Sequence, residues 1–274
     1  MTRITPTLAA FALAALAALV EPATAADPLL PLRPAPSAMS WYGSFIGIQA
    51  GYAWGSEAVE FTNATGALAG TLGVTIPRAL AQNPAGFVGG AQWGSNWQSD
   101  RFVYGFFSDF SYSDIRASET LALGGGALGT RSNFAEQRLM WFGTSRLRGG
   151  YLVSDNLLLY GSGGLASGTT EVTVSNNAAG LPCSFAGACP FGSDSKTRYG
   201  WALGLGAEYA YGPWSITLDY IHYDLGRLNL TYGDGVSTSF ATTSTRFSGD
   251  MLRGGINYRF NWTFWDLLTG RARL

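Results

Sequence analysis

Few residues of this chain are of types that could carry catalytic chemistry. The chain contains a single histidine, His222, in the stretch YIHYDLG. A hydrolase with a serine nucleophile needs a histidine to activate the serine and an acid to orient the histidine, yet no serine adjoins His222. The sequence also lacks a phosphate-binding loop, a Gly-x-Ser-x-Gly motif and a cluster of metal ligands. It therefore predicts a protein that is not an enzyme, with no catalytic residue, metal site or cofactor.

A second set of residues could form ion pairs. These charged residues lie in stretches where apolar and polar residues alternate, each on the polar side: Asp109, Arg146, Arg148, Glu208, Asp219, Arg253 and also Arg259. Arginine paired with carboxylate satisfies both charges where the dielectric constant is low. If the polar sides face inward, we expect an internal network of ion pairs in place of a hydrophobic core. A charged pore is the alternative.

The elements that would position these residues are β-strands. Apolar and polar residues alternate with a period of two, the pattern of a strand with two different faces. Eight stretches show it: Tyr42–Gly55, Gly86–Gln98, Phe102–Ser113, Arg138–Leu152, Leu157–Val172, Tyr199–Tyr211, Trp214–Leu225 and Phe247–Trp262. The fifth stretch is rich in glycine, and its phase is ambiguous.

The connections between the stretches alternate in length. Short ones are Ser99–Arg101, Val153–Asn156 and Gly212–Pro213, which contain turn-forming residues. Four long connections, predicted to be loops, span Ser56–Ala85, Asp114–Gln137, Thr173–Arg198 and Gly226–Thr245. Outer-membrane barrels have short periplasmic turns and long extracellular loops. We therefore expect an all-β fold, an eight-stranded antiparallel up-and-down transmembrane barrel with both termini in the periplasm.

Composition helps to choose between a membrane barrel and a soluble one. Charged residues make up 13% of the chain, against about 25% in a typical soluble domain. The chain also carries 9 Trp and 13 Tyr, which fit aromatic girdles at the two membrane interfaces. A secreted β-sandwich or lipocalin-like barrel is the rival, with its apolar face inward. The net charge of −1 predicts no nucleic-acid partner.

The N-terminus predicts export. Arg3 precedes an apolar run from Leu8 to Val20, and cleavage is expected between Ala25 and Ala26. The predicted segments are a signal peptide (1–25), a Pro-rich periplasmic leader (26–40), the barrel (41–262) and a C-terminal periplasmic tail (263–274).

Export also bears on the two cysteines, Cys183 and Cys189, in PCSFAGACP. In an exported protein a close pair predicts a disulfide, with two free thiols as the alternative. The bond would pin a small loop more than stabilise the fold.

Five segments in order resemble a known family: GFVGGAQWGSNWQ (86–98), FVYGFFSDFSYSDI (102–115), WFGTSRLRGGY with LLLYGSGGLASG (141–168), RYGWALGLGAEYAYGPWSITLDYIHYDLG (198–226) and LRGGINYRF (252–260). They resemble small outer-membrane β-barrels of the OmpA-like and opacity-protein superfamily, especially the alphaproteobacterial surface antigens often labelled porin family. The resemblance covers about Tyr42 to Phe260. It implies insertion by the outer-membrane assembly machinery and roles in envelope integrity, surface antigenicity and sometimes adhesion.

The chain departs from that family at two places. Family members often end on the aromatic residue of the last strand, which the insertion machinery recognises, whereas here 14 residues follow Phe260. We expect Tyr258 and Phe260 to serve as this assembly signal, and TFWDLL to form an amphipathic turn at the periplasmic interface or to be disordered. Where relatives commonly carry an acid, this chain has Phe107, so one inward charge is missing.

These observations predict an outer-membrane protein with a structural and surface-interaction role. A narrow porin for small solutes and an adhesin acting through its loops are the alternatives. The expected partners are outer-membrane lipid and lipopolysaccharide, the assembly machinery and periplasmic chaperones, and the expected state is a monomer.

Overall fold

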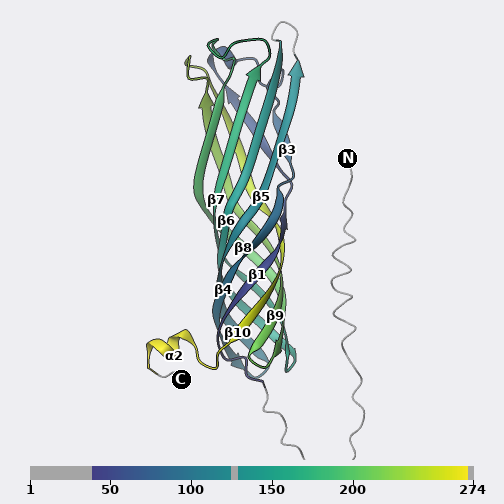
Figure 1. The fold of residues 1–274 in the computed structure, drawn as a ribbon, viewed down its shortest axis with the longest axis vertical. Helices are drawn as coiled ribbons and strands as arrows, with labels where there is room; N and C mark the ends of the chain where they lie inside the picture. Colours follow the sequence, from purple (N-terminus) through teal and green to yellow (C-terminus); the bar gives the residue numbers. More distant parts are fainter. Residues whose placement is uncertain (1–38, 125–128, 271–274) are drawn as a thin grey trace, which may run out of the picture. The chain divides into compact units, whose positions relative to one another are not determined.

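The computed structural model describes residues 39–124 and 129–270, which form an antiparallel β-barrel (Figure 1). Its ring is closed because β1 pairs with both β4 and β10, and the strands from β4 to β10 pair in sequence order. The eight ring strands are β1 Gly43–Trp54, β4 Ala85–Ser99, β5 Phe102–Gly124, β6 Thr130–Ser154, β7 Leu157–Ala178, β8 Phe191–Tyr211, β9 Trp214–Gly233 and β10 Phe240–Arg259. The predicted eight-stranded up-and-down barrel is confirmed. The signal peptide, the Ala25/Ala26 cleavage site and most of the leader lie outside the described residues.

Two ends of the barrel differ in how the strands connect. At one end, called the turn end, two-residue turns at 100–101, 155–156 and 212–213 join neighbouring strands. Asp100 and Gly212 have φ values of 52° and 57° there, the left-handed backbone that tight turns require. The opposite end, called the loop end, carries the other connections and lies at the top of Figure 1.

The strands reach much further toward the loop end than the sequence predicted. β5 and β6 have 23 and 25 residues, whereas a membrane-spanning strand needs about 9–11. The connections predicted as loops at Asp114–Gln137, Thr173–Arg198 and Gly226–Thr245 therefore consist mostly of β-strand that belongs to the barrel wall. Cross-strand hydroxyl pairs such as Thr169–Thr197, Thr173–Ser193 and Thr231–Thr242 lie on the wall there.

The prediction of a loop at Gly226 was wrong because a bulge reverses the alternation. Ser248 of β10 pairs with Asp224, but Arg246 pairs with Arg227, so β9 holds one extra residue. Gly226, at φ 79°, lies in this bulge. Beyond it Leu228 and Leu230 point inward, with 1% and 7% of their surface exposed. The pattern continues in the opposite phase, which makes it look as if the strand had ended.

The first predicted loop, Ser56–Ala85, is also part of the wall. It contains β2 Glu57–Ala64, the short 3-10 helix η2 Gly66–Leu68 and β3 Ala79–Gln82. β2 pairs with β10 beyond the point where β1 ends, β3 pairs with β2, and β3 contacts β5. The wall has two breaks, one between β1 and β2 and one between β3 and β4. The Gly55 N–H in the first break donates to the Pro84 carbonyl in the second, at 2.8 Å. The β2–β3 hairpin thus continues the wall above the ends of β1 and β4.

Three layers fill the interior. At the turn end, Trp41 packs with Val103, Leu152, Leu158, Tyr160 and Ala210. Its indole N–H donates to the Asp155 carbonyl at 2.9 Å. The middle layer is polar and charged. The third layer, toward the loop end, is an apolar core that includes Val59, Phe61, Phe142, Leu228, Leu230 and Met251. This core corrects the expectation that polar residues replace a hydrophobic core throughout.

The outer face is apolar over a band around the barrel. Ile48, Leu147 and Leu165 are 69%, 72% and 71% exposed. Large aromatic residues are exposed toward both edges of the band, including Trp54, Tyr112 and Trp201 on the loop side and Phe102, Tyr151 and Trp214 on the turn side. A water-soluble barrel would turn these faces the other way. None of the helices among the described residues has the length and apolar character to cross a membrane.

After β10 the chain forms a short helix, α2 Phe264–Leu268. Thr263 begins it with a capping box: the Asp266 N–H donates to the Thr263 hydroxyl, and the Thr263 N–H donates to the Asp266 carboxylate. Of the two expectations for TFWDLL, an amphipathic turn or disorder, the structure has the ordered turn.

Candidate functional site

The middle layer of the interior is built around Asp109 of β5. Arg253 of β10 donates to both of its oxygens, at 2.8 and 3.3 Å, and the Thr144 hydroxyl donates to Oδ2. Arg146 of β6 approaches Oδ2 at 3.5 Å. All three charged side chains are at most 1% exposed. One carboxylate thus lies between two arginines that come from strands on different sides of the barrel.

A second centre lies around Glu208 of β8. Arg148 of β6 donates to Oε2 at 2.8 Å, and the Ser215 hydroxyl donates to Oε1 at 2.5 Å. Arg148 also donates from Nε to the Asn96 side-chain oxygen at 2.8 Å. Asp219 takes a different partner, the Tyr160 hydroxyl at 2.6 Å, rather than an arginine. The two centres hold three arginines and three acids, so their formal charges cancel.

Aromatic rings fill the spaces between the arginines. Arg146 lies over the Phe107 ring with its guanidinium carbon 4.3 Å from the centroid. Arg148 lies among three rings, at 4.9 Å from Phe45, 5.2 Å from Tyr160 and 5.6 Å from Phe107. Cation–π attraction is stronger when the cation is removed from water. Where an inward acid was expected to be missing, the chain therefore supplies the face of an aromatic ring.

Sequence reasoning missed the role of Phe107, although a signal was present. Phe107 is two residues from Asp109 and shares its parity, so strand alternation alone places it inward. Sequence reasoning considered this position only as one from which an inward charge is missing, and not as that of a ring that could contact the arginines. Glycine has a matching role on β8: a Cβ atom at Gly204 would lie 2.9 Å from Arg146 Nη1, and one at Gly206 would lie 2.5 Å from the Tyr160 ring.

The interior is tightly filled. The six residues predicted for the network are between 0% and 5% exposed. A cavity near the wall breaks, lined by Pro84, Ile115, Tyr223 and Phe247 among others, measures about 10 Å³, which is room for about one water molecule. Because a one-residue slip of any strand would turn its charges toward the apolar band, the network also specifies the register.

Arg259 lies apart from both centres, at the turn end. Its Nη2 donates to the Ser40 carbonyl at 2.6 Å, and its guanidinium carbon is 4.5 Å above the Trp41 ring. Tyr258 and Phe260, the predicted assembly signal, flank it in sequence, with their ring centroids 5.2 Å apart.

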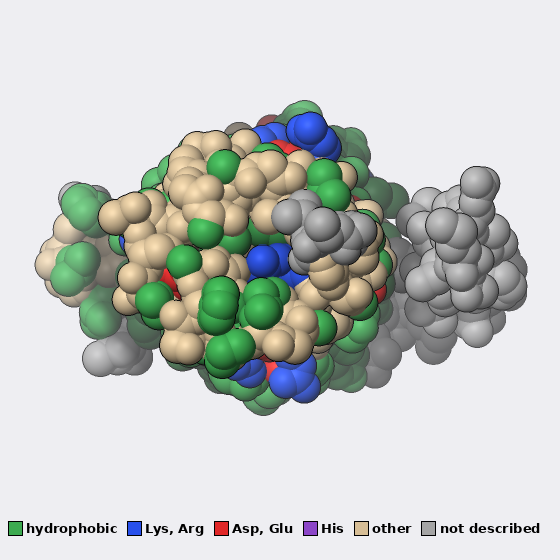
Figure 2. All heavy atoms as spheres, turned by 90° about the horizontal axis from the view of Figure 1, so that it is seen from above, with side chains coloured by type: hydrophobic (Ala, Val, Ile, Leu, Met, Phe, Trp, Pro, Cys, Tyr) green, Lys and Arg blue, Asp and Glu red, His purple; other side chains and the backbone are tan. Residues whose placement is uncertain are grey.

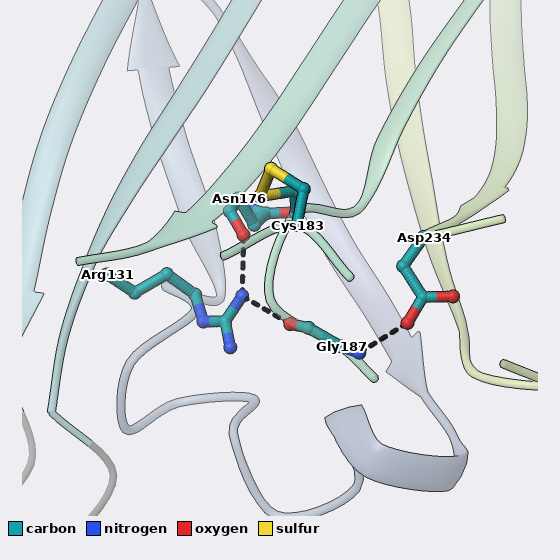
Figure 3. Close-up of a disulfide and its surroundings, with 6 residues drawn as sticks. Arg131, Asn176, Cys183, Gly187 and Asp234 are labelled. Carbon is teal, nitrogen blue, oxygen red and sulfur yellow. Dashed lines mark hydrogen bonds between the residues drawn. A yellow bond between two sulfur atoms is a disulfide. The ribbon is translucent and has the colours of Figure 1, made fainter. Parts of the chain in front are cut away.

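The disulfide lies in the loop between β7 and β8, at the loop end. Cys183 and Cys189 are bonded, with Cα atoms 5.1 Å apart, which confirms the prediction. Figure 3 shows the surrounding contacts: Arg131 donates to the Asn176 and Gly187 carbonyls at 2.5 and 2.9 Å, and the Gly187 N–H donates to the Asp234 carboxylate. Bonds from the backbone N–H groups of Gly187 and then Ser237 hold the pKa of Asp234 well below its usual range.

Two asparagines extend this arrangement to the first connection. Asn133 donates to the Thr75 carbonyl at 2.8 Å, and Asn176 donates to the Asn133 side-chain oxygen at 2.8 Å. The Tyr232 hydroxyl donates to the Asn176 side chain, and burial raises the Tyr232 pKa well above its usual value. Segments from three connections are thus linked into one cap over the loop end, defined here as residues 65–78, 179–190 and 234–239.

His222 faces outward from β9. Its Nδ1 is 2.9 Å from Asp250 Oδ1, and the Tyr220 hydroxyl donates to the same oxygen at 2.7 Å. Sequence reasoning did not foresee Asp250 as a partner, because only strand register brings residues of β9 and β10 together. Among the described residues, this hydrogen-bonded group joins His222 to a tyrosine and an acid and includes no serine.

Comparisons with known proteins agree with this architecture. Residues 8–260 match the model of the outer membrane protein beta-barrel domain. The chain is 36% identical over 260 residues to a 31 kDa outer-membrane immunogenic protein of Brucella melitensis biotype 1, covering 92% of this chain and 96% of that protein. It is 32% identical over 163 residues to a 22 kDa outer membrane protein of Rhizobium leguminosarum bv. viciae, covering 60% and 59% of the two chains.

Among solved structures, the outer membrane protein OprG from Pseudomonas aeruginosa aligns with a TM-score of 0.48 and 13% identity, over 80% of this chain and 96% of OprG. The outer membrane protease OmpT from Escherichia coli aligns with a TM-score of 0.43 and 10% identity, over 80% and 97% of the two chains.

Proposed function

The chain belongs to the outer membrane protein β-barrel family, and from this premise we propose that it is a closed structural barrel that displays its braced loop end as a surface antigen. The interior carries this proposal, because apolar layers lie on both sides of the charged middle layer and the network residues are at most 5% exposed. Eight strands leave an interior just wide enough for side chains to fill. The protein would strengthen the envelope without conducting solutes and without catalysis.

The proposed orientation places the turn end in the periplasm and the loop end outside the cell. Short turns on the periplasmic side are the rule for outer-membrane barrels. The strands extend past the apolar band only at the loop end, where the wall carries hydroxyl pairs that suit water. The relative from Brucella melitensis is described as immunogenic. By analogy, the cap would be the part of this chain that host antibodies bind.

Solute flux tests the closed interior. Purified barrel folded into liposomes should leave the rate of swelling in isosmotic arabinose at that of protein-free liposomes. A general porin in the same lipid serves as the positive control. Swelling that rises with the amount of folded barrel would contradict the proposal and favour a narrow porin.

A second candidate function, adhesion, rests on exposed apolar side chains at the loop end. Leu181, Phe185 and Val236 are 47%, 60% and 57% exposed, and Figure 2 shows hydrophobic side chains gathered on this mostly uncharged face. Hot spots of protein interfaces favour large aromatic side chains. Changing Phe185 to Ser should reduce cell binding if the cap is an adhesin. The matched control is Phe191 to Ser, 59% exposed on the wall, and equal binding by both variants would remove adhesion as a function.

The remaining partners are proposed from the family. The assembly machinery would recognise Tyr258 and Phe260 at the end of β10, after periplasmic chaperones have delivered the chain. Outer-membrane phospholipid and lipopolysaccharide would surround the apolar band. Each of the eight ring strands is paired on both sides over the apolar band, so the ring offers no strand edge within the membrane for pairing with a second chain, which supports a monomer.

A further inference from the structure

Helix α2 is attached to the barrel rim at the turn end. The Tyr42 hydroxyl donates to Asp266 Oδ2 at 2.5 Å, and the Phe264 N–H donates to the Ser44 hydroxyl at 2.8 Å. The preceding residue, Thr263, is 1% exposed. In Figure 1 the helix extends sideways from the lower end of the barrel. The contacts fix the start of α2 to β1, so its position is set by the wall.

The exposed side of α2 is apolar. Trp265, Leu267 and Leu268 are 65%, 50% and 80% exposed. A helix of five residues is too short to be stable in water by itself, and these three side chains pack against little of the described barrel. Such a face needs an apolar or interfacial environment.

The lipid-facing wall leads directly into this helix. Ring centroids follow one another from Trp214 to Tyr258 at 5.1 Å, to Phe260 at 5.2 Å, to Trp262 at 4.9 Å and to Phe264 at 6.1 Å. Aromatic residues in this position form the girdle that lies among lipid headgroups. The series therefore carries the membrane interface from β10 to the first residue of α2.

An open groove lies beside the same series of rings. It holds about 400 Å³ and is lined by Tyr42, Pro213, Tyr258, Arg259 and Phe260 among others. Arg259 lines this groove and brings a positive charge to it, while its Nη2 donates to the Ser40 carbonyl at 2.6 Å. An arginine among exposed rings suits a phosphate group above acyl chains.

We propose that α2 and this groove form an interfacial anchor that binds the phospholipid leaflet at the turn end, with Trp265, Leu267 and Leu268 among the headgroups and upper acyl chains. Amphipathic helices lie about 5–10 Å into this boundary. A second copy of the chain is the competing occupant, but the aromatic series is continuous with the lipid-facing wall. The inference rests on the proposed orientation only for the choice of leaflet.

A fluorescent label at the helix tests the anchor. The chain has no free cysteine among the described residues, so Leu268→Cys can be labelled alone with an environment-sensitive dye under non-reducing conditions. The matched control is Ser99→Cys, exposed at the same end of the barrel on β4. Both variants are folded into phosphatidylethanolamine–phosphatidylglycerol vesicles, and folding is verified by the change of gel mobility on boiling.

The anchor predicts that the label at residue 268 emits at shorter wavelength than the label at 99. Lipids brominated near the headgroup end of the acyl chain should quench the first label and leave the second almost unchanged. Water-like emission at residue 268 in a folded, inserted barrel would overturn the anchor while leaving the closed barrel intact. In a second measurement, lipid is added at constant protein so that the barrels are diluted in the membrane. If the emission of the label at residue 268 then shifts to the wavelength seen in water, the apolar face is covered by a second copy of the chain, which also overturns the proposal.

Discussion

At the scale of the residue, Arg148 and Glu208 meet where neither side chain can reach water. Their atoms are 2.8 Å apart, and the side chains are 2% and 0% exposed. Removing two charges from water opposes folding, so such a pair is weak support for stability, yet losing one partner leaves an uncompensated charge. The network is therefore better understood as a device that specifies register and fills the interior.

The first prediction follows from this asymmetry. Arg148→Leu should lower the free energy of unfolding by about 3–5 kcal/mol, because Glu208 keeps its charge without a cation. Arg148→Met with Glu208→Met should recover most of the loss. Reversible urea unfolding in lipid vesicles measures both, with Arg138→Leu as control.

The control removes an exposed pair instead. Arg138 and Glu136 lie 3.7 Å apart with side chains 45% and 31% exposed, and such pairs contribute about 0–1 kcal/mol. An Arg148 variant that loses no more than this control would refute the account of the interior.

The second prediction concerns Phe107. Phe107→Leu retains an apolar side chain but removes the ring that Arg146 and Arg148 share, so we expect a loss of about 2 kcal/mol. Phe87→Leu on the outer face, where Phe87 is 53% exposed, should lose much less. The same urea titration compares them, and equal losses would show that the ring acts only by volume.

At the scale of the element, each of the long strands β5 to β10 has one segment in the apolar band and another beyond it. In the first segment the apolar side chains face out, and in the second they face in. β9 makes the change between Tyr220, which is 43% exposed, and Ile221, which is 0% exposed, and the bulge at Gly226 then reverses the parity of the inward residues. Alternation alone could therefore find the membrane segments, but it could not follow the strands past the point where their faces exchange roles.

The third prediction concerns the cap. Replacing Cys183 and Cys189 by Ala should leave the barrel folded, because the bond closes a loop of separation 6 far from the ring closure. The loop itself should open more often, which exposes the backbone next to Phe185. Chymotrypsin should then cleave after Phe185 faster than in the oxidised protein. Unchanged cleavage would mean that Arg131 and Asp234 hold the loop without the disulfide.

The fourth prediction separates the assembly signal from the tail. Phe260→Ala should reduce the folded fraction in the outer membrane, because the aromatic at the end of β10 is expected to be recognised during insertion. Deletion of residues 263–274 should leave that fraction unchanged. Heat-modifiable gel mobility after membrane fractionation measures the folded fraction of both variants. The opposite pattern would show that the assembly machinery recognises residues of the tail instead of Phe260.

At the scale of the whole molecule, the ring and the disulfide were predictable, but the distribution of the core was not. Asp109, Arg146, Arg148, Glu208, Asp219 and Arg253 could be assigned to the polar side of their strands from parity. Their pairing depends on register across the barrel: Arg253 is opposite Asp219 on the neighbouring strand yet donates to Asp109. The β2–β3 hairpin was missed because its strands are only 8 and 4 residues long.

Single-channel recording tests the closed interior most directly. Barrel whose folding has been verified by gel mobility is added to a planar bilayer, and insertion is verified by recovering the protein from the membrane. The account predicts a baseline current with no reproducible steps, because ion pairs and rings occupy the middle layer and an apolar core lies above it. Uniform conductance steps that appear with the wild-type barrel, and disappear when it is unfolded by boiling, would contradict it.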